Sequence, residues 1–203
     1  RWHWFYIEWG CKPKKHDAFR LHFLLEGNPS LSQRIIDRYK SMYTGVFYNR
    51  YICGEWCVAE GLVYDFGEDN IVDEIPSNGE YYISIDYGTM NPFSAGLWCV
   101  LGDKATRIKE YYYNGREKAV QRTDEDYCDS VEELAKGYNI RQIVVDPSAA
   151  SFIAALRRRG FTIRKANNDV LDGIRRTAVY LKNGNIKIHR SCVDTIAEFG
   201  LYR

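Results

Sequence analysis

The second half of the chain alternates regularly between apolar and polar residues. From Tyr81 to Asp86 the apolar side chains fall at every second position, the period of a strand with one buried face, and Asp86 lies on the opposite face. Phe93–Leu101 and Thr106–Tyr113 predict two further strands, and Gly102-Asp103 between them is a tight-turn signal. Three strands in succession favour an antiparallel meander.

The pattern then changes to alternating helices and strands. Thr123 opens an acidic helix that ends near Gly137, and Ile140–Val145 is a short apolar run typical of a strand buried between helices. The remaining predicted elements are a helix to Gly160, a strand at Phe161–Lys165, a helix at Val170–Leu181, a strand at Ile186–Ile188 and a helix at Cys192–Phe199. A strand that follows the helix and joins the meander in parallel gives a mixed α/β sheet with flanking helices, the RNase H-like layout, which other folds share.

The first part of the chain predicts a smaller, irregular or helical segment. Apolar residues recur at helical spacing at Leu31, Ile35, Tyr39 and Met42, and Thr44-Gly45 ends that helix. The aromatic segment Val46–Val58 is compatible with a strand or a packed loop. Gly61–Glu80 is acidic without a basic residue, and Pro76–Gly79 reads as a linker or boundary. We therefore expect residues 1–76 and residues 77–203 to form separate parts.

Charge and cysteine usage narrow the function classes only slightly. The formal net charge is +1, but residues 141–190 hold eleven Lys or Arg against three Asp, which permits contact with nucleic acid. Cys53 and Cys57 lack the second Cys/His pair of a zinc site, so buried free thiols are expected. Reduced cysteines and the lack of a signal-peptide pattern favour a cytosolic protein, and no apolar stretch reaches the ~20 residues that span a bilayer.

Two aspartates carry the candidate chemistry. Asp86 and Asp146 each end a predicted strand and precede a turn, and carboxylates at strand ends of an α/β sheet face the crevice where such folds bind ligands. Two carboxylates at one spot repel each other, and a divalent cation such as Mg²⁺ or Mn²⁺ relieves that conflict. Alternatively, each Asp is only a turn former, or Asp146 caps the following helix. The residues alone leave both interpretations open.

Four motifs in register resemble one family. Residues 85–92, with Ile85-Asp86-Tyr87-Gly88, and residues 144–150, with Val144-Val145-Asp146-Pro147, resemble the first and second nuclease motifs of phage terminase large subunits of the PBSX type. Upstream, residues 22–31 and residues 43–56 resemble the end of the motor ATPase domain of the same family. The resemblance covers nearly the whole chain and follows the family's order.

This resemblance implies a function in viral DNA packaging. Residues 1–76 would be the tail of the ATPase domain plus a linker, and residues 77–203 an RNase H-like nuclease domain truncated at its C-terminus. The nuclease would cut concatemeric double-stranded DNA with two Mg²⁺ or Mn²⁺ ions, and Asp86 and Asp146 would be its catalytic metal ligands. The implied partners are DNA, the portal protein and the small terminase subunit, in the cytoplasm of the bacterial host.

The chain also departs from the family pattern. It lacks a G-x-x-x-x-G-K-[ST] motif, so ATP would be bound only in an upstream part, and the chain is expected to be a fragment. The family's last nuclease motif is missing as well, so a third acidic ligand is expected beyond residue 203. Asp194 and Glu198 lie on the last predicted helix in a different context and are not counted as ligands. Another RNase H-like nuclease, of the resolvase or transposase type, and a catalytically inert structural fragment remain alternatives.

Several basic residues are candidates for contact with the DNA backbone. They are Arg157, Arg158, Arg159, Lys165, Arg175 and Arg176, with Arg164 beside them. A basic last helical turn is also favoured by the helix dipole, so these residues have a structural interpretation too.

Overall fold

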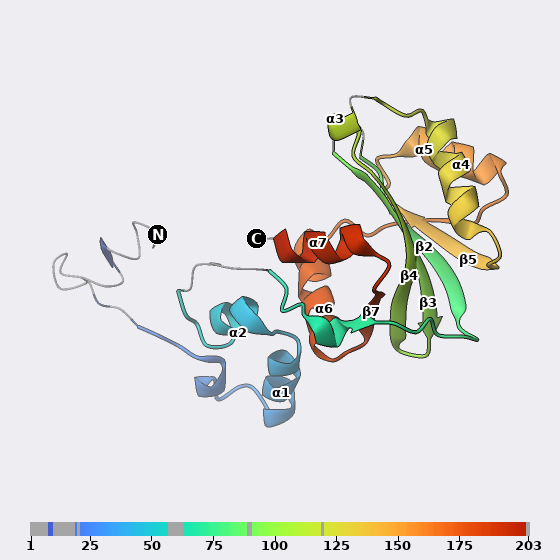
Figure 1. The fold of residues 1–203 in the computed structure, drawn as a ribbon. Coiled ribbons are helices and arrows are strands. Elements are labelled where there is room, and N and C mark those ends of the chain that lie inside the picture. The colour runs from blue at the N-terminus through green and yellow to red at the C-terminus, as the bar shows by residue number, and fades with distance from the viewer. Residues whose placement is uncertain are drawn as a thin grey trace. The chain divides into compact units, whose positions relative to one another are not determined.

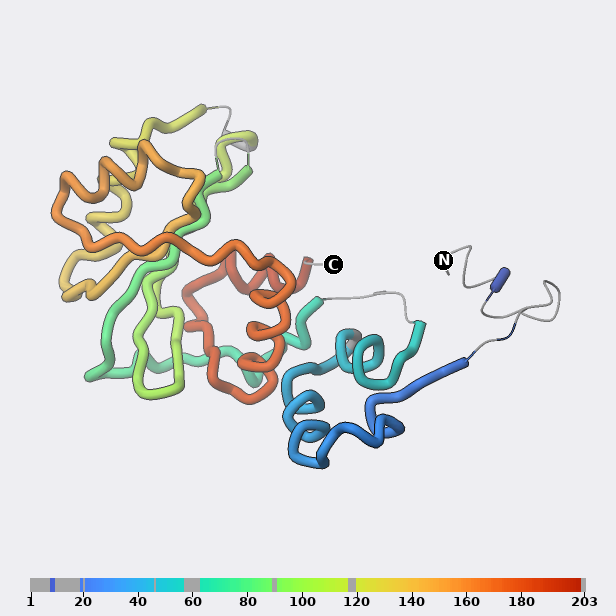
Figure 2. The backbone as a smooth tube through the Cα atoms, turned by 180° about the vertical axis from the view of Figure 1, so that it is seen from behind, coloured from blue at the N-terminus to red at the C-terminus, as the bar shows by residue number. Residues whose placement is uncertain are grey.

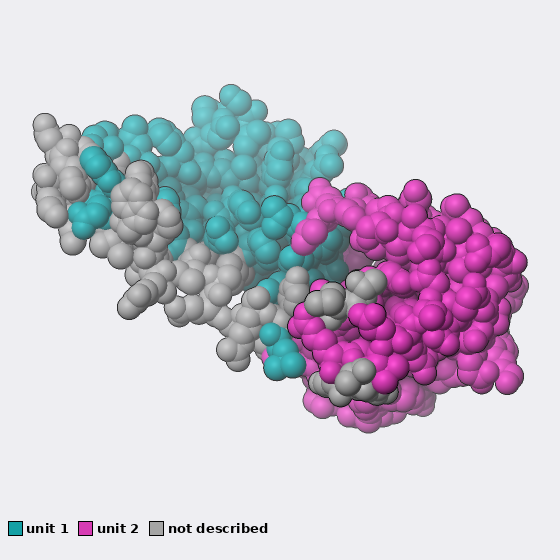
Figure 3. Space-filling view, turned by 90° about the horizontal axis from the view of Figure 1, so that it is seen from above, with its two compact units in different colours: residues 1–65, 171–179, 201–203 teal, residues 66–170, 180–200 magenta. Residues whose placement is uncertain are grey.

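The computed structural model describes residues 8–9, 19, 21–56, 63–88, 91–118 and 120–201. The chain divides into two compact units (Figure 3). Unit 1 comprises residues 1–65, 171–179 and 201–203, and unit 2 comprises residues 66–170 and 180–200. Among the described residues, no helix is long and apolar enough to cross a membrane.

Unit 2 is built around one mixed sheet (Figure 1). Within the described residues its strand order is β1-β7-β4-β3-β2-β5-β6. The strands are β1 (Ile71–Val72), β2 (Glu80–Asp86), β3 (Phe93–Leu101), β4 (Lys104–Tyr113), β5 (Ile140–Val145), β6 (Ile163–Lys165) and β7 (Ile186–His189). β3 is antiparallel to both of its neighbours, and the other described pairs are parallel. The predicted meander and the parallel fifth strand are confirmed.

Local sequence explains the central strands. Gly102 adopts the left-handed conformation (φ 64°) that the tight turn between β3 and β4 requires. Ile83 and Ile85 of β2 are buried, so by alternation Asp86 lies on the opposite face of the sheet. Asp86 of β2 pairs with Ser94 of β3, and Ile85 pairs with Val145 of β5. The core therefore fixes which face of β2 carries the candidate carboxylate.

Two helices cover the buried face of this sheet (Figure 1). α4 (Asp124–Ala135) begins at Thr123, whose hydroxyl accepts a hydrogen bond from the Asp126 amide in a capping box. α5 (Ala150–Arg158) ends before Gly160, which has a φ of 89°. Both helices contribute to one apolar cluster with β2, β3 and β5, and Phe152 and Val131 are fully buried in it. This packing confirms a sheet with flanking helices.

The last helix, α7 (Val193–Leu201), begins at a buried ion pair of β4. The Glu110 carboxylate accepts hydrogen bonds from the amides of Asp194 at 2.9 Å and Thr195 at 3.1 Å, and Arg107 Nη2 lies 3.7 Å from it. These two amides are among those at a helix start that lack a partner within the helix. A side chain from a distant strand thus determines where α7 begins.

Unit 1 holds shorter elements. They are a 3-10 turn, η3 (Leu25–Gly27), the helices α1 (Gln33–Ser41) and α2 (Gly45–Tyr51), and residues 171–179 of α6 (Val170–Lys182). The predicted helix near residues 31–42 is confirmed as α1. The strand or loop expected for Val46–Val58 is wrong up to Tyr51, because Gly45–Tyr51 is helical, whereas residues 52–56 are irregular and residues 57–58 lie outside the described residues. Ile36, Ile52 and Ala178 are the buried apolar residues that the described part of this unit contributes.

Unit 2 begins earlier than the sequence indicates. The 3-10 turn η4 (Glu68–Asn70) and β1 lie in the acidic segment that was expected to be a linker, and β1 pairs with β7 in parallel. The Asn70 amide donates to the Leu181 carbonyl oxygen at 2.9 Å. The unit therefore starts at Phe66 instead of residue 77. A further short helix, α3 (Gly115–Lys118), had no signal in the pattern.

Candidate functional site

The two candidate aspartates lie at the ends of neighbouring parallel strands. Asp86 is the last residue of β2, and Asp146 directly follows Val145, the last residue of β5. Because Ile85 and Val145 are paired in register, the next residue of each strand emerges at the same edge of the sheet. The register therefore brings Asp86 and Asp146 together, as the pattern of strand ends indicated.

The surroundings of Asp86 disfavour the ionised form of its carboxyl. Burial raises the pKa of its carboxyl, and the negative charge of Asp146 raises that pKa further. Within the part of the chain that the structure describes, no hydrogen-bond donor or cation is assigned to the Asp86 carboxylate, although the residue is solvent-exposed. An exposed turn former would normally use its carboxylate to accept a local hydrogen bond.

Asp146 is held in place from both sides. Its Oδ1 accepts from the Ser148 amide at 2.7 Å, and its Oδ2 accepts from the Asn168 side-chain amide at 3.2 Å. The hydrogen bonds from Ser148, followed by that from Asn168, lower the pKa of Asp146. Asp146 is thus the turn former that one interpretation expected, and it is also an ionised carboxylate next to Asp86.

The donor set fits a hard divalent cation. Two carboxylates at one sheet edge, one of them destabilised by the charge of the other, supply the oxygen ligands that Mg²⁺ and Mn²⁺ prefer. Across the described ranges, no group of three or more His, Cys, Asp or Glu side chains is arranged to hold a metal ion. Asp194 and Glu198 of α7 therefore form no such group with the pair.

The chain segment after Asp86 is anchored by an aromatic residue. The Tyr87 ring stacks on Phe152 at 4.9 Å between centroids, and its hydroxyl donates to Asp124 Oδ1 at 2.5 Å. Burial raises the pKa of Tyr87. Next to it, a Cβ on Gly88 would meet the Pro92 carbonyl oxygen at 2.6 Å, so only glycine fits without a shift. Thr89 and Met90 of the same motif lie outside the described residues.

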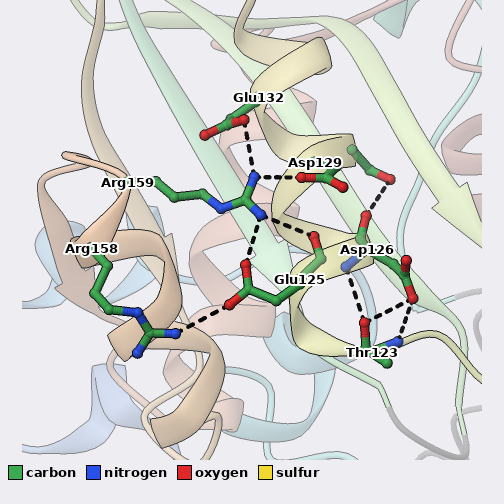
Figure 4. A network of polar contacts seen from close by, with 8 residues as sticks. Thr123, Glu125, Asp126, Asp129, Glu132, Arg158 and Arg159 are labelled. Atoms are coloured by element: carbon green, nitrogen blue, oxygen red, sulfur yellow. Dashed lines mark hydrogen bonds and ion pairs between the residues drawn. The ribbon is translucent and has the colours of Figure 1, made fainter.

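The arginines at the end of α5 contact the acidic helix α4 (Figure 4). Arg159 lies within ion-pair distance of three carboxylates, Glu125 at 2.7 Å, Asp129 at 2.5 Å and Glu132 at 3.0 Å. Arg158 pairs with Glu125 at 3.1 Å. These contacts join the two helices that cover the buried face of the sheet. They give Arg158 and Arg159 a structural role between two helices, in addition to the helix-dipole interpretation that the sequence allowed.

The other basic candidates fall into two groups. Arg157 of α5 and Arg164 and Lys165 of β6 are exposed in unit 2, with no ion pair assigned to them within the described residues. Arg175 and Arg176 of α6 belong to unit 1, where both pair with Asp172 of the same helix. The candidates are thus divided between the two units, and within unit 2 only Arg157, Arg164 and Lys165 are exposed with no ion pair assigned to them among the described residues.

Asn168 is a site residue that the sequence pattern did not reveal. It lies in the segment between β6 and α6, which belongs to the orange part of the tube in Figure 2. The Ala166 amide of this segment donates to the Val145 carbonyl oxygen, at the end of β5, at 2.8 Å. Its position in the sequence could have indicated this role, because Asn168 closely follows a strand that ends at the same sheet edge as Asp146.

The cysteines and His189 show no functional arrangement within the described residues. Cys53, expected to be a buried free thiol, is free but only half-buried. Cys57, the other member of the pair, lies outside the described residues. Cys99, Cys128 and Cys192 are buried free thiols, and burial raises the pKa of Cys128 and of Cys192 to about 11. The His189 ring nitrogens contact the Ser191 hydroxyl and the Asp73 carbonyl oxygen, a structural role.

Comparison with solved structures gives close matches. The large terminase of a thermophilic bacteriophage, in complex with ADP, is 41% identical, with a TM-score of 0.80, over 98% of this chain and 51% of that protein. The chain thus spans about half the length of that terminase. No family model matches the chain, and the search of curated proteins gives no match.

Two more distant structures share the fold of unit 2. The nuclease domain of the P22 large terminase matches with a TM-score of 0.58 and 15% identity, over 70% of this chain and 79% of that domain. The large terminase nuclease of the thermophilic phage G20c with bound zinc matches with a TM-score of 0.50 and 14% identity, over 65% of this chain and 75% of that protein. These likenesses confirm the RNase H-like mixed sheet expected for the second part of the chain.

Proposed function

Because this chain belongs to the family of phage large terminases, we propose that its unit 2 is a metal-dependent endonuclease that cuts concatemeric double-stranded DNA during packaging. The observation that carries the proposal is the carboxylate pair at the ends of β2 and β5. Burial and the charge of Asp146 raise the pKa of Asp86, so they destabilise its ionised form. A bound cation would relieve this destabilisation, and perturbed carboxyl groups of this kind are typical of functional sites. The 41% identity to a large terminase argues against a resolvase or transposase.

Asp86 and Asp146 would hold the cation, with Mg²⁺ or Mn²⁺ as the expected species. A two-ion site of this kind activates water and stabilises the leaving oxygen of a phosphodiester. In this chain Asp146 supplies a preoriented ionised carboxylate, since Ser148 and Asn168 fix its two oxygens. Asp86 supplies a carboxylate that titrates above its ordinary range, so protons and cations compete for it.

The DNA backbone would approach along β6, the edge strand beside β5. Arg164 and Lys165 are exposed there, and Arg164 pairs in register with Val144, two residues before Asp146. Arg157 of α5 is a further exposed candidate. Arg158 and Arg159 contribute less to DNA affinity in this proposal, because carboxylates of α4 neutralise them. Arg175 and Arg176 stay candidates, although Asp172 pairs with both.

The remaining assignments follow from the family. The solved large terminase that is 41% identical to this chain binds ADP, and we assign ATP use to a part of the motor that these 203 residues do not include. Residues 1–65 would then be the tail of that ATPase domain. The portal protein and the small terminase subunit are the proposed partners, and the bacterial host cytoplasm is the proposed place of action.

The test is nicking of supercoiled plasmid in the presence of Mn²⁺. We would compare the full-length protein that carries this chain with its Asp86→Asn and Asp146→Asn variants, with chelator added as a blank. Each variant keeps the shape of the side chain and removes the charge that binds the cation. Loss of one ligand should lower the rate by at least about 100-fold, because several kcal/mol of transition-state stabilisation disappear. Undiminished cutting by both variants would refute the proposal and favour turn formers in an inert structural part.

A further inference from the structure

The segment that follows β6 reaches the candidate metal site with one side chain. After Lys165, the Ala166 amide donates to the carbonyl oxygen of Val145, which holds this segment against the end of β5. Two residues later the Asn168 side-chain amide donates to Oδ2 of Asp146 at 3.2 Å. The Ser148 amide holds the other oxygen, Oδ1, at 2.7 Å. The Asp146 carboxylate is therefore fixed by one local and one distant donor.

The Ser148 amide and the Asn168 side-chain amide have different effects on the orientation of the Asp146 carboxylate. Ser148 is two residues from Asp146 and forms a turn that any Asp in this loop can form. Asn168 is twenty-two residues away, so its hydrogen bond sets the carboxylate plane relative to another part of the sheet edge. An ionised carboxylate oxygen has two acceptor sites, so Oδ2 can accept from Asn168 and still bind a cation.

We propose that Asn168 is a positioning residue for Asp146 and thereby sets the affinity of the carboxylate pair for a divalent cation. The proposal rests on the function proposed above. Asn168 acts by restricting the rotamer of Asp146 before the cation arrives, which reduces the ordering that binding must impose. Partners that orient metal ligands through hydrogen bonds typically change metal affinity by about 10- to 100-fold when they are removed.

The neighbouring residue provides a matched control. Asn167 is exposed like Asn168, but its side-chain oxygen accepts from the Asp169 amide at 3.3 Å, within the same loop. Replacing either residue with Ala removes the same atoms from a solvent-exposed loop. Only Asn168→Ala removes a donor to Asp146. A difference between the two variants therefore reports on that contact.

The experiment is calorimetric titration of the full-length protein that carries this chain with Mn²⁺. Its arms are the unsubstituted protein, Asn168→Ala, Asn167→Ala, Asp86→Asn and Asp146→Asn. Asn168→Ala should bind Mn²⁺ about 10-fold more weakly, at the lower end of the range because Asn168 is exposed. Asn167→Ala should bind like the unsubstituted protein, and the two Ala variants should have the same cation-free Tm. In the full-length protein, raised Mn²⁺ should restore nicking to Asn168→Ala and not to Asp146→Asn.

The possible results distinguish the role of Asn168 from the metal-dependent nuclease function on which it rests. Unchanged Mn²⁺ affinity in Asn168→Ala, with binding lost in the two Asp variants, would overturn the role of Asn168 and leave the nuclease proposal standing. A marked fall in the cation-free Tm of Asn168→Ala alone would also overturn it, since the residue would then be structural. No Mn²⁺ binding by the unsubstituted full-length protein, or full binding by both Asp variants, would overturn the metal site and the inference together.

Discussion

Asp86→Asn should stabilise unit 2 at pH 7 when no divalent cation is present. The carboxylate of Asp86 is partly desolvated and repelled by Asp146, and no donor within the described residues compensates it. Asn has the same shape and no charge, so the substitution removes the repulsion and leaves the packing intact. A residue kept only to form a turn would give the opposite result, because its replacement would remove a favourable contact.

The increase in the free energy of unfolding that Asp86→Asn should cause can be estimated from the strand geometry. Neighbouring strands lie about 4.8 Å apart, and Asp86 and Asp146 follow a registered pair of residues. We therefore take the distance between the two carboxylate charges to be on the order of 6 Å. Coulomb's law then gives about 0.7 kcal/mol at the dielectric constant of water and about 1.4 kcal/mol at half that value. Because Asp86 is exposed, solvent screening favours the lower figure.

The pH dependence has a definite sign. The folded-state pKa of Asp86 is raised above its ordinary value of 3.8, so ionisation opposes folding, and the penalty grows as pH rises through that range. The advantage of Asp86→Asn should therefore be present at pH 7 and vanish below pH 3.8. The pKa of Asp146 is lowered, so its charge stabilises the fold above the ordinary value and that contribution is lost as pH falls. Asp146→Asn should accordingly destabilise the fold at pH 7.

Hydrogen exchange of amides in β2 and β5 is the suitable measurement, because it reports on unit 2 alone. Protection in these strands would be compared at pH 7 and pH 3.5, with chelator and then with Mn²⁺. Mn²⁺ should stabilise the unsubstituted protein through linkage and should leave Asp86→Asn unchanged. If Asp86→Asn lowers protection at pH 7 in chelator, the reasoning on Asp86 is refuted.

Three further predictions concern the framework around the site. Arg159→Ala should lower the Tm of unit 2, and the decrease in Tm should be smaller in 1 M NaCl, because salt screens the ion pairs between Arg159 and α4. An equal decrease in thermal melts at low salt and in 1 M NaCl would contradict this. Gly88→Ala should weaken Mn²⁺ binding, since its Cβ would displace the turn after Asp86; unchanged binding in calorimetry would show that the turn can adapt. A chain that begins at Phe66 should melt higher than one that begins at residue 77, which lacks β1; equal melting would support the later boundary.

Local sequence determined the central elements and the two aspartates. The alternation in β2 depends on contacts between one face and the core, which neighbouring residues encode, and the Thr123 capping box is complete within four residues. The bounds of β3 were predicted correctly for the same reason. Asp86 and Asp146 could be named as candidates because a strand end followed by a turn is a local signal.

Only the tertiary structure decided how distant segments meet. β1 has two residues and carries no periodicity, and it is a strand because β7 lies beside it. The ion pairs of Arg159 with three carboxylates of α4 could not be read from its place in a basic helical turn. Asn168 gained its place next to Asp146 from the parallel pairing of β5 and β6. Each of these contacts joins residues far apart in the chain, and its formation depends on packing that no short stretch of sequence contains.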